Sequence, residues 1–157
     1  MHVDWQTGLG RMTYGIYVLT TSHAGTINGM IASWVSQVSH QPPLIMAAVH
    51  PNRRTHDLVE KSGCFALHVI ARSQKALLQR FKGPDPRDKF AGIAWAAGQT
   101  GCPVLEDCLA WFECRVRTTY RPGNHSLFVG EIVAAGVRDE DVPLSTLDYE
   151  GTYTGRS

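Results

Sequence analysis

The chain has 157 residues, of which 43% are hydrophobic and 18% are charged, and its formal net charge at pH 7 is +1. This length predicts a single domain, residues 1–157, with a core of its own. The scattered basic residues give no electrostatic footprint for nucleic acid or an anionic membrane, so we expect neither as a partner. No apolar run approaches the ~20 residues of a membrane span and the start does not resemble a signal peptide, which predicts a cytoplasmic protein.

The first half of the chain shows the two-residue periodicity of β-strands. Residues 14–21 are rich in β-branched and aromatic side chains, and residues 22–25 supply a turn into a second strand over about 26–39. Prolines at 42 and 43 end that strand. Residues 44–49 then form a continuous apolar run, which predicts a strand covered on both faces.

Two short helices are predicted after these strands. Residues 55–61 carry an acidic residue early and a basic residue late, and Gly63 follows as a stop signal. Ser73 can cap a second helix, which ends at residues 83–84. Between the helices, residues 65–69 alternate as a strand.

The second half returns to β-structure with longer strands. Residues 109–119 alternate, with Glu113 on the polar side, and the turn at 121–124 leads into an antiparallel partner over 126–137. Tight turns, not helical crossovers, join successive strands. The sequence therefore predicts a mainly β fold, an antiparallel barrel with one or two short covering helices.

Motifs for several common chemistries are absent. The sequence has no G-x-x-x-x-G-K-[ST] loop, no G-x-S-x-G elbow and no G-x-G-x-x-G fingerprint. ATP hydrolysis, acyl transfer on a hydrolase fold and a Rossmann domain are therefore not expected. The seven histidines lack the spacing that places two imidazoles on one helical face, so no metal site is predicted.

The four cysteines contain no C-x-x-C pair. A domain of this size does not need disulfides, so we interpret them as reduced structural thiols. Cys102 and Cys108 flank a short proline-containing stretch, and a redox pair formed by these two residues is the alternative.

Residues 50–56 place Asn52, Arg53 and Thr55 between a strand end and a helix start. Free backbone N–H groups, the positive end of the helix dipole and guanidinium groups together make a phosphate-binding site. A solvated loop with a threonine cap is the alternative interpretation.

Two further segments carry polar groups at unexpected places. Residues 28–34 bring Asn28, Ser33 and Trp34 into an otherwise apolar strand, which suits the wall of a pocket for a planar heterocycle with polar edges. The alternative is a core tryptophan beside an ordinary turn. His125, in the turn at 123–126, can donate a hydrogen bond or carry a proton near neutral pH, unless it is simply a turn residue.

Taken together, these segments resemble the flavin reductase-like family of FMN-binding split barrels, over about residues 14–147. The resemblance is closer to flavoredoxin-like and diflavin-partner proteins than to FAD-preferring monooxygenase partners. The matching segments are YGIYVLT (14–20), NGMIASWVSQVS (28–39), QPPLI (41–45), NRRTH (52–56), DKFAGI (88–93) and GNHSLFVGEI (123–132).

The resemblance implies a six-stranded split β-barrel that forms a homodimer and binds one FMN per subunit, with FAD the less favoured flavin. It implies one catalytic residue, His125, close to the flavin and to the nicotinamide. The implied cofactor contacts are isoalloxazine contacts by Asn28 and Trp34, backbone contacts to the ring edge by Ile31, Ala32 and Ser33, phosphate contacts by Asn52, Arg53 and Thr55, and a contact of Lys89 with the phosphate or the pyrimidine edge.

The expected reaction is hydride transfer from NAD(P)H to flavin N5, and onward transfer to free flavin, a redox protein or a monooxygenase component. Two alternatives remain open at the level of sequence. One is a flavoredoxin-type electron carrier that turns over NAD(P)H poorly, and the other is a relative that binds pyridoxal phosphate or haem. The sequence does not choose between NADH and NADPH.

Overall fold

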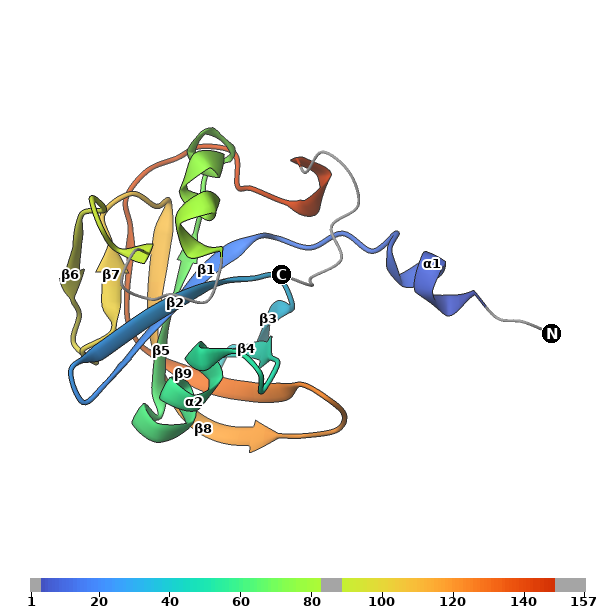
Figure 1. Cartoon of the computed structure of the whole chain (residues 1–157), viewed down its shortest axis with the longest axis horizontal. Helices are drawn as coiled ribbons and strands as arrows, with labels where there is room; N and C mark the ends of the chain where they lie inside the picture. The colour runs from blue at the N-terminus through green and yellow to red at the C-terminus, as the bar shows by residue number, and fades with distance from the viewer. Residues whose placement is uncertain (1–3, 83–88, 149–157) are drawn as a thin grey trace.

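The structure, a computed structural model, describes residues 4–82 and 89–148. Within these residues short helices alternate with a larger number of strands (Figure 1). The helices are α1 (Trp5–Leu9), α2 (Arg54–Ser62), and the 3-10 helices η1 (Arg72–Phe81) and η2 (Thr146–Asp148). The strands are β1 (Tyr17–His23), β2 (Thr26–Ala32), β3 (Val35–Ser39), β4 (Leu44–Val49), β5 (Cys64–Val69), β6 (Trp95–Ala97), β7 (Pro103–Leu105), β8 (Ala110–Tyr120) and β9 (Ser126–Val137).

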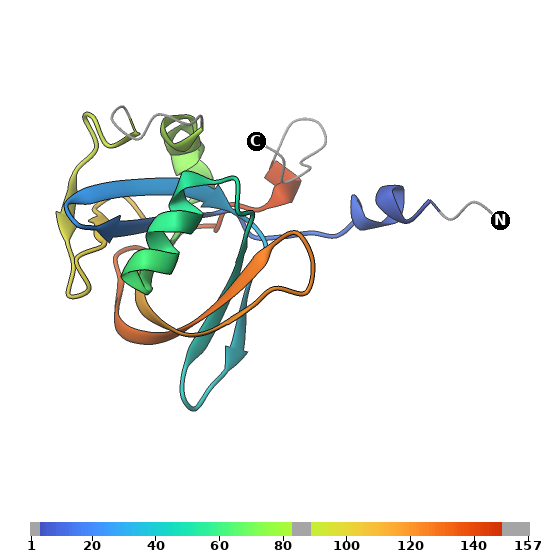
Figure 2. The ribbon, with the colours of Figure 1, turned by 60° about the horizontal axis from the view of Figure 1, so that its bottom comes forward.

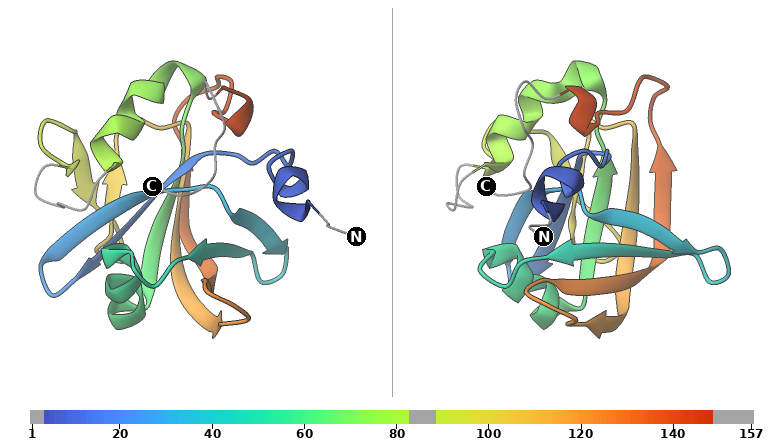
Figure 3. Two further views of the ribbon diagram at one scale, coloured as in Figure 1. Left: turned by 45° about the vertical axis from the view of Figure 1, so that its right-hand side comes forward. Right: turned by 90° about the vertical axis from the view of Figure 1, so that its right-hand side faces the viewer.

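A seven-stranded antiparallel sheet with the order β2-β1-β5-β8-β9-β4-β3 dominates the fold. Figure 3 shows that this sheet is strongly bent, so that the β3–β4 hairpin runs across the direction of β5. The prediction of a mainly β antiparallel fold is confirmed. The predicted six-stranded barrel is not reproduced, because the sheet has seven strands and its pairing is not closed between β2 and β3. The small β6–β7 hairpin, which the periodicity did not predict, forms a second sheet.

The strand predicted over residues 26–39 is in fact two strands. The chain breaks at Ser33 and Trp34, after which β3 pairs with β4 while β2 pairs with β1. The break places β2 and β3 at opposite edges of the sheet. Alternation of side chains continues through the break, and for this reason the sequence pattern did not reveal it.

The first hairpin differs slightly from its predicted bounds. β1 begins at Tyr17 instead of residue 14 and continues to His23, so the turn consists of Ala24 and Gly25 alone. Both turn residues have positive φ, 50° and 81°. Such a turn matches the twist of the paired strands and strongly favours glycine at the second position.

The two helices have different outcomes. α2 and its left-handed C-cap at Gly63, with φ 68°, confirm the first prediction. The second helix is a 3-10 helix that begins at Arg72, and its N-terminal cap is Ala71 instead of the predicted Ser73. The Gln74 side chain accepts a hydrogen bond from the Ala71 N–H at 3.0 Å. The predicted end at residues 83–84 lies outside the described residues.

The core consists of separate clusters of buried hydrophobic side chains, because successive strand residues point to opposite faces of the sheet. One cluster includes Leu19, Phe65 and Phe128, and another includes Ile70 and Leu78. β4 was expected to be covered on both faces, but its burial alternates, since only every second residue is fully buried. It is therefore a strand with one buried face.

α2 packs against β1 and β2, as Figure 2 shows from a second side. This packing places the N-terminal end of α2 beside β2. The short helix α1 buries none of its residues and projects away from the sheet (Figure 1). In the described parts of the chain, no helix combines the length and hydropathy needed to span a bilayer.

Candidate functional site

A cleft of about 540 Å³ lies where β2 meets the N-terminal end of α2. It brings together side chains from β2, the β4–α2 loop, the end of η1 and the segment after residue 88. The lining residues that the sequence predicted are Asn28, Ile31, Asn52, Arg53, Thr55 and Lys89. The cleft is also lined by Met30, Pro51 and Arg54, which belong to the predicted segments 28–34 and 50–56, and by Asp57 and Phe81, which were not predicted.

The N-terminal end of α2 gives the cleft its anion-binding character. A turn precedes the helix, in which the Arg53 N–H donates to the His50 carbonyl at 3.0 Å. The first N–H groups of a helix have no acceptor within it, and the helix dipole adds a partial positive charge there. Thr55 is buried at this point, and Arg53 and Arg54 both line the cleft. This end of the cleft therefore suits a phosphate or another anion.

Lys89 supplies a cation from a distant segment of the chain. Its side chain is 5% exposed, and its Nζ donates to the Gly29 carbonyl at 2.7 Å. Burial lowers the pKa of Lys89, and the positive charge of Arg53 lowers that pKa further. An anion bound between Lys89 and Arg53 would relieve the repulsion between them.

β2 forms the opposite wall. Asn28 is buried, and its side-chain oxygen accepts a hydrogen bond from the Gly29 N–H at 2.8 Å. A Cβ atom at Gly29 would come within 2.8 Å of the Phe81 ring, which also lines the cleft. Glycine at this position therefore lets an aromatic ring approach the strand closely.

A second group of predicted residues lies just outside the cleft lining. The rings of Trp34 and His125 are 4.6 Å apart, and His50 meets His125 edge-on at 5.1 Å. Burial lowers the pKa of His125, and nearby His50 and Arg53 lower that pKa further. His50 begins the predicted phosphate-binding segment 50–56, but its contact with His125 was not predicted.

The predicted residues between these two groups do not line the cleft. Ala32 and Ser33 are buried at the end of β2, where the chain bends toward β3. Trp34 follows the bend, and its side chain is 39% exposed. The backbone carbonyl of Trp34 accepts a hydrogen bond from the Ala48 N–H at 2.9 Å, which fixes this residue against β4. The break in the predicted strand thus separates Trp34 from Asn28.

The cysteines are free, as predicted, but the alternative pairing of Cys102 with Cys108 is not found. Cys102 Sγ lies 3.3 Å from Cys64 Sγ, whereas Cys108 Sγ contacts the Leu105 carbonyl. Cys102 is therefore paired with Cys64 and not with Cys108, and all four cysteines are free. The hydrogen bond from the Cys102 thiol lowers the pKa of Cys64 to about 6, and the same contact raises the pKa of Cys102.

Comparison with known proteins shows which family the chain is similar to. The model of the flavin reductase like domain matches residues 9–156. HsaB of Rhodococcus jostii, the reductase subunit of a flavin-dependent monooxygenase, is 32% identical over 151 residues, covering 96% of this chain and 76% of HsaB. RutF of Agrobacterium fabrum, an NADH-dependent FMN reductase, is 28% identical over 143 residues, covering 90% of this chain and 82% of RutF.

Solved structures agree with the sequence relatives. Nitrilotriacetate monooxygenase component B from Mycobacterium thermoresistibile superimposes with a TM-score of 0.83 at 28% identity, covering 98% of this chain and 84% of that chain. The expected closer similarity to flavoredoxin-like and diflavin-partner proteins stays a prediction, because HsaB and diflavin flavoprotein A 1 of Synechocystis are nearly equally identical to this chain, at 32% and 31%. The broader resemblance and the predicted class of activity, flavin reduction, agree with these relatives. The chain therefore belongs to the flavin reductase-like family.

Proposed function

We propose that the protein is an NAD(P)H-dependent flavin reductase that binds FMN in the cleft between β2 and α2. The observation that carries this proposal is the position of Arg53, Arg54 and Lys89 around the N-terminal end of α2 within one cleft. These cations and the helix end match the single phosphate of FMN. When bound, flavin accepts a hydride from NAD(P)H and passes electrons to a second acceptor.

Each group of residues has a distinct role in this proposal. Asn52, Arg53 and Thr55 hold the phosphate, while Asn28 and Ile31 face the ring from the cleft wall. The ring edge extends past the cleft lining to the backbone of Ala32 and Ser33. Lys89, a buried cation, stabilises the negative charge that develops on a reduced ring. Trp34 and His125 lie beside the cleft, and His125 orients the incoming nicotinamide.

We also propose a homodimer and an electron-accepting partner. Trp34 is 39% exposed beside the cleft, and Trp5 and Met12 at the projecting N-terminal end are 60% and 53% exposed. A second copy would cover this apolar surface. In this proposal the bent sheet is a split barrel, the location is cytoplasmic, and the acceptor is free flavin or a monooxygenase component, as the name of HsaB suggests.

Two measurements test the proposal. The first is anaerobic bleaching of the flavin bands by NADH and by NADPH, which we expect to be rapid with at least one nucleotide. Persistent bands in a flavin-loaded protein would contradict the reductase assignment and favour an electron carrier fed by a protein partner. Tighter binding of FAD than of FMN would overturn the choice of flavin.

The second measurement compares FMN with riboflavin, which lacks the phosphate. We expect Arg53→Gln to weaken FMN binding at least tenfold and riboflavin binding far less, since a charge-assisted hydrogen bond contributes about 1.5–3 kcal/mol. Arg117→Gln is the matched control, because Arg117 is an exposed residue of β8 paired with Glu131. Equal weakening of both flavins would exclude Arg53 from the phosphate site.

A further inference from the structure

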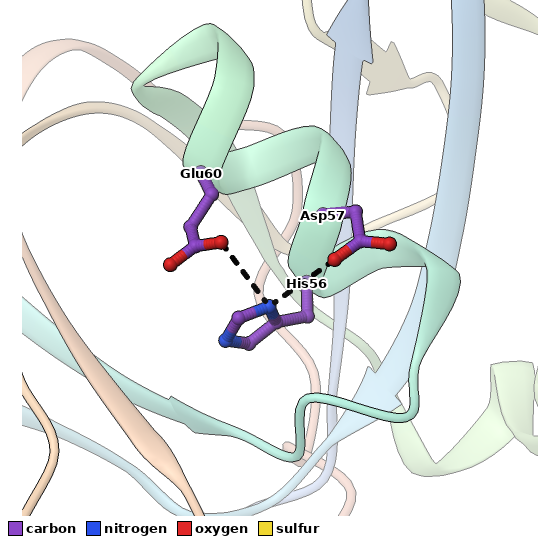
Figure 4. A group of neighbouring side chains, drawn as sticks. All are labelled: His56, Asp57 and Glu60. Carbon is purple, nitrogen blue, oxygen red and sulfur yellow. Dashed lines mark ion pairs between the residues drawn. The ribbon is translucent and has the colours of Figure 1, made fainter.

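Three side chains in the first two turns of α2 have the arrangement of metal ligands. Figure 4 shows His56 with its Nδ1 facing the carboxylates of Asp57 and Glu60. Nδ1 lies 3.7 Å from Asp57 Oδ1 and 3.9 Å from Glu60 Oε2. The three donor atoms lie within 4.8 Å of one another, and no other such group occurs among residues 4–82 and 89–148. The sequence analysis missed it because it searched for pairs of histidines.

The buried ring of His56 lacks a partner on the side that faces these carboxylates. His56 is 4% exposed, and its Nε2 lies 2.7 Å from Ser126 Oγ. In the described part of the chain, Nδ1 is the one buried side-chain nitrogen or oxygen without a hydrogen bond. When Nε2 donates its proton to Ser126, Nδ1 presents a lone pair toward two carboxylates. In that tautomer, a cation bound between the three atoms would remove the repulsion between the lone pair and the carboxylates.

The spacing of the three atoms suits a small divalent cation. Zn²⁺ lies about 2.0–2.2 Å from nitrogen and oxygen ligands, so adjacent ligands of a tetrahedral ion are separated by roughly 3.3–3.6 Å. The distances from Nδ1 to the carboxylates, 3.7 and 3.9 Å, are only slightly longer. Asp57 and Glu60 are 66% and 40% exposed, so both side chains have room to close around an ion.

The surroundings have the features of an outer shell around a metal site. Ser126 orients the imidazole through Nε2, as a hydrogen-bond partner commonly does for a ligating histidine. Arg121 forms an ion pair with Glu60 Oε1 and leaves Oε2 facing His56.

We propose that His56, Asp57 and Glu60 bind a divalent first-row transition-metal ion, with Zn²⁺ the best match to one imidazole and two carboxylates. Water fills the remaining coordination positions, because three protein ligands leave a Zn²⁺ site open. Since Asp57 also lines the cleft, the ion lies at the cleft edge. The site needs no flavin and is independent of the proposed reductase activity.

Calorimetric titration of the full chain with Zn²⁺, after removal of adventitious metal with a chelator, tests the site. We expect one Zn²⁺ per chain, and at least tenfold weaker binding in Asp57→Asn and in Glu60→Gln. These two variants change exposed carboxylates, so their folding is expected to be retained. Ser126→Ala should weaken binding about 10–100-fold, the usual cost of losing an outer-shell partner.

Two controls separate this site from other donors. Cys64→Ser tests whether the pair of thiols formed by Cys64 and Cys102 binds the added metal. Glu140→Gln removes an exposed carboxylate that is not part of the proposed site. Both should bind Zn²⁺ like the parent protein, and Co²⁺ added in place of Zn²⁺ should show no thiolate charge-transfer band. Absence of stoichiometric Zn²⁺ binding, or binding that Asp57→Asn and Glu60→Gln leave unchanged, would overturn the proposal.

Discussion

The indole of Trp34 and the imidazole of His125 lie 4.6 Å apart and are tilted by 47°. The two residues come from the bend between β2 and β3 and from the turn before β9, which are far apart in the sequence. His50 contacts the same imidazole from a third segment. Burial lowers the pKa of His125, and the nearby His50 and Arg53 lower that pKa further, which favours the neutral form of the ring. A neutral imidazole at this place can donate a hydrogen bond to a bound nucleotide or accept one from it.

His125→Asn should slow flavin reduction while leaving flavin affinity nearly unchanged. Asparagine keeps a polar group but loses the imidazole that packs on Trp34, so the nicotinamide is oriented less well. We expect kcat/KM for NAD(P)H to fall roughly 10–100-fold, a loss of about 1.4–2.7 kcal/mol in transition-state stabilisation. Anaerobic stopped-flow spectroscopy measures this rate. His40→Asn, at an exposed position beyond β3, is the control, and a rate equal to that of the parent would refute the role of His125.

Lys89→Met should weaken both flavin binding and the fold. The substitution removes a cation from the cleft and leaves the Gly29 carbonyl without its donor at 2.7 Å. Loss of a buried hydrogen bond partner costs about 1–3 kcal/mol. We expect FMN affinity to fall at least fivefold and the free energy of unfolding to fall by roughly this amount.

Fluorescence titration with FMN and urea denaturation measure the two effects of Lys89→Met. Lys61→Met, at the exposed end of α2, should change neither quantity. An Lys89→Met protein that is less stable but binds FMN with unchanged affinity would assign Lys89 a purely structural role.

Cys64 and Cys102 should form a disulfide under mild oxidation. Their sulfur atoms lie 3.3 Å apart, and the lowered pKa of Cys64, about 6, favours its reactive thiolate form. Diamide accepts the two electrons and two protons that the pair loses. Peptide mapping by mass spectrometry should find Cys64 linked to Cys102, with Cys108 and Cys114 still alkylatable. A Cys102–Cys108 linkage would show instead that the alternative pairing suggested by the sequence is accessible.

His68 should make the protein less stable as the pH falls from about 6.5 toward 4. The ring is fully buried, its Nδ1 lies 3.0 Å from the Val18 carbonyl, and its Nε2 accepts from Leu105 N–H at 3.1 Å. Burial lowers its pKa from 6.5 to about 4. Between these values the unfolded chain binds a proton that the folded chain does not bind, so acid favours unfolding.

Keeping His68 neutral contributes roughly 3 kcal/mol to the free energy of unfolding. This contribution is fully present above pH 6.5 and is lost by pH 4. Urea denaturation at a series of pH values measures it. His68→Gln should be less stable at pH 7 but should show a shallower loss of stability between pH 6.5 and 4, whereas His40→Gln should keep the slope of the parent. An unchanged slope in His68→Gln would assign the acid sensitivity to other groups.

Local patterns predicted much of this fold because they act within a few residues. The dipole-matched charges and Gly63 identified α2, and the apolar run over 44–49 identified β4. Alternation identified β8, and the turn at 121–124 identified β9 as its antiparallel partner. Alternation failed for Glu113, which was assigned to the polar side but is 1% exposed. Its carboxylate accepts hydrogen bonds from the N–H groups of Gln99 and Thr100 at 3.0 and 2.8 Å, and those residues belong to a segment that the periodicity left unassigned.

The sequence by itself determined the family, the antiparallel class and most of the residues that line the cleft at the N-terminal end of α2, because each of these depends on short segments in a fixed order. Only the tertiary structure decided that Trp34 and His125 pack together, that Phe81 closes the cleft, and that Cys102 meets Cys64. These contacts join segments that are distant in the chain. Their formation depends on the strand order and on the bend after Ala32, and no local periodicity encodes either feature.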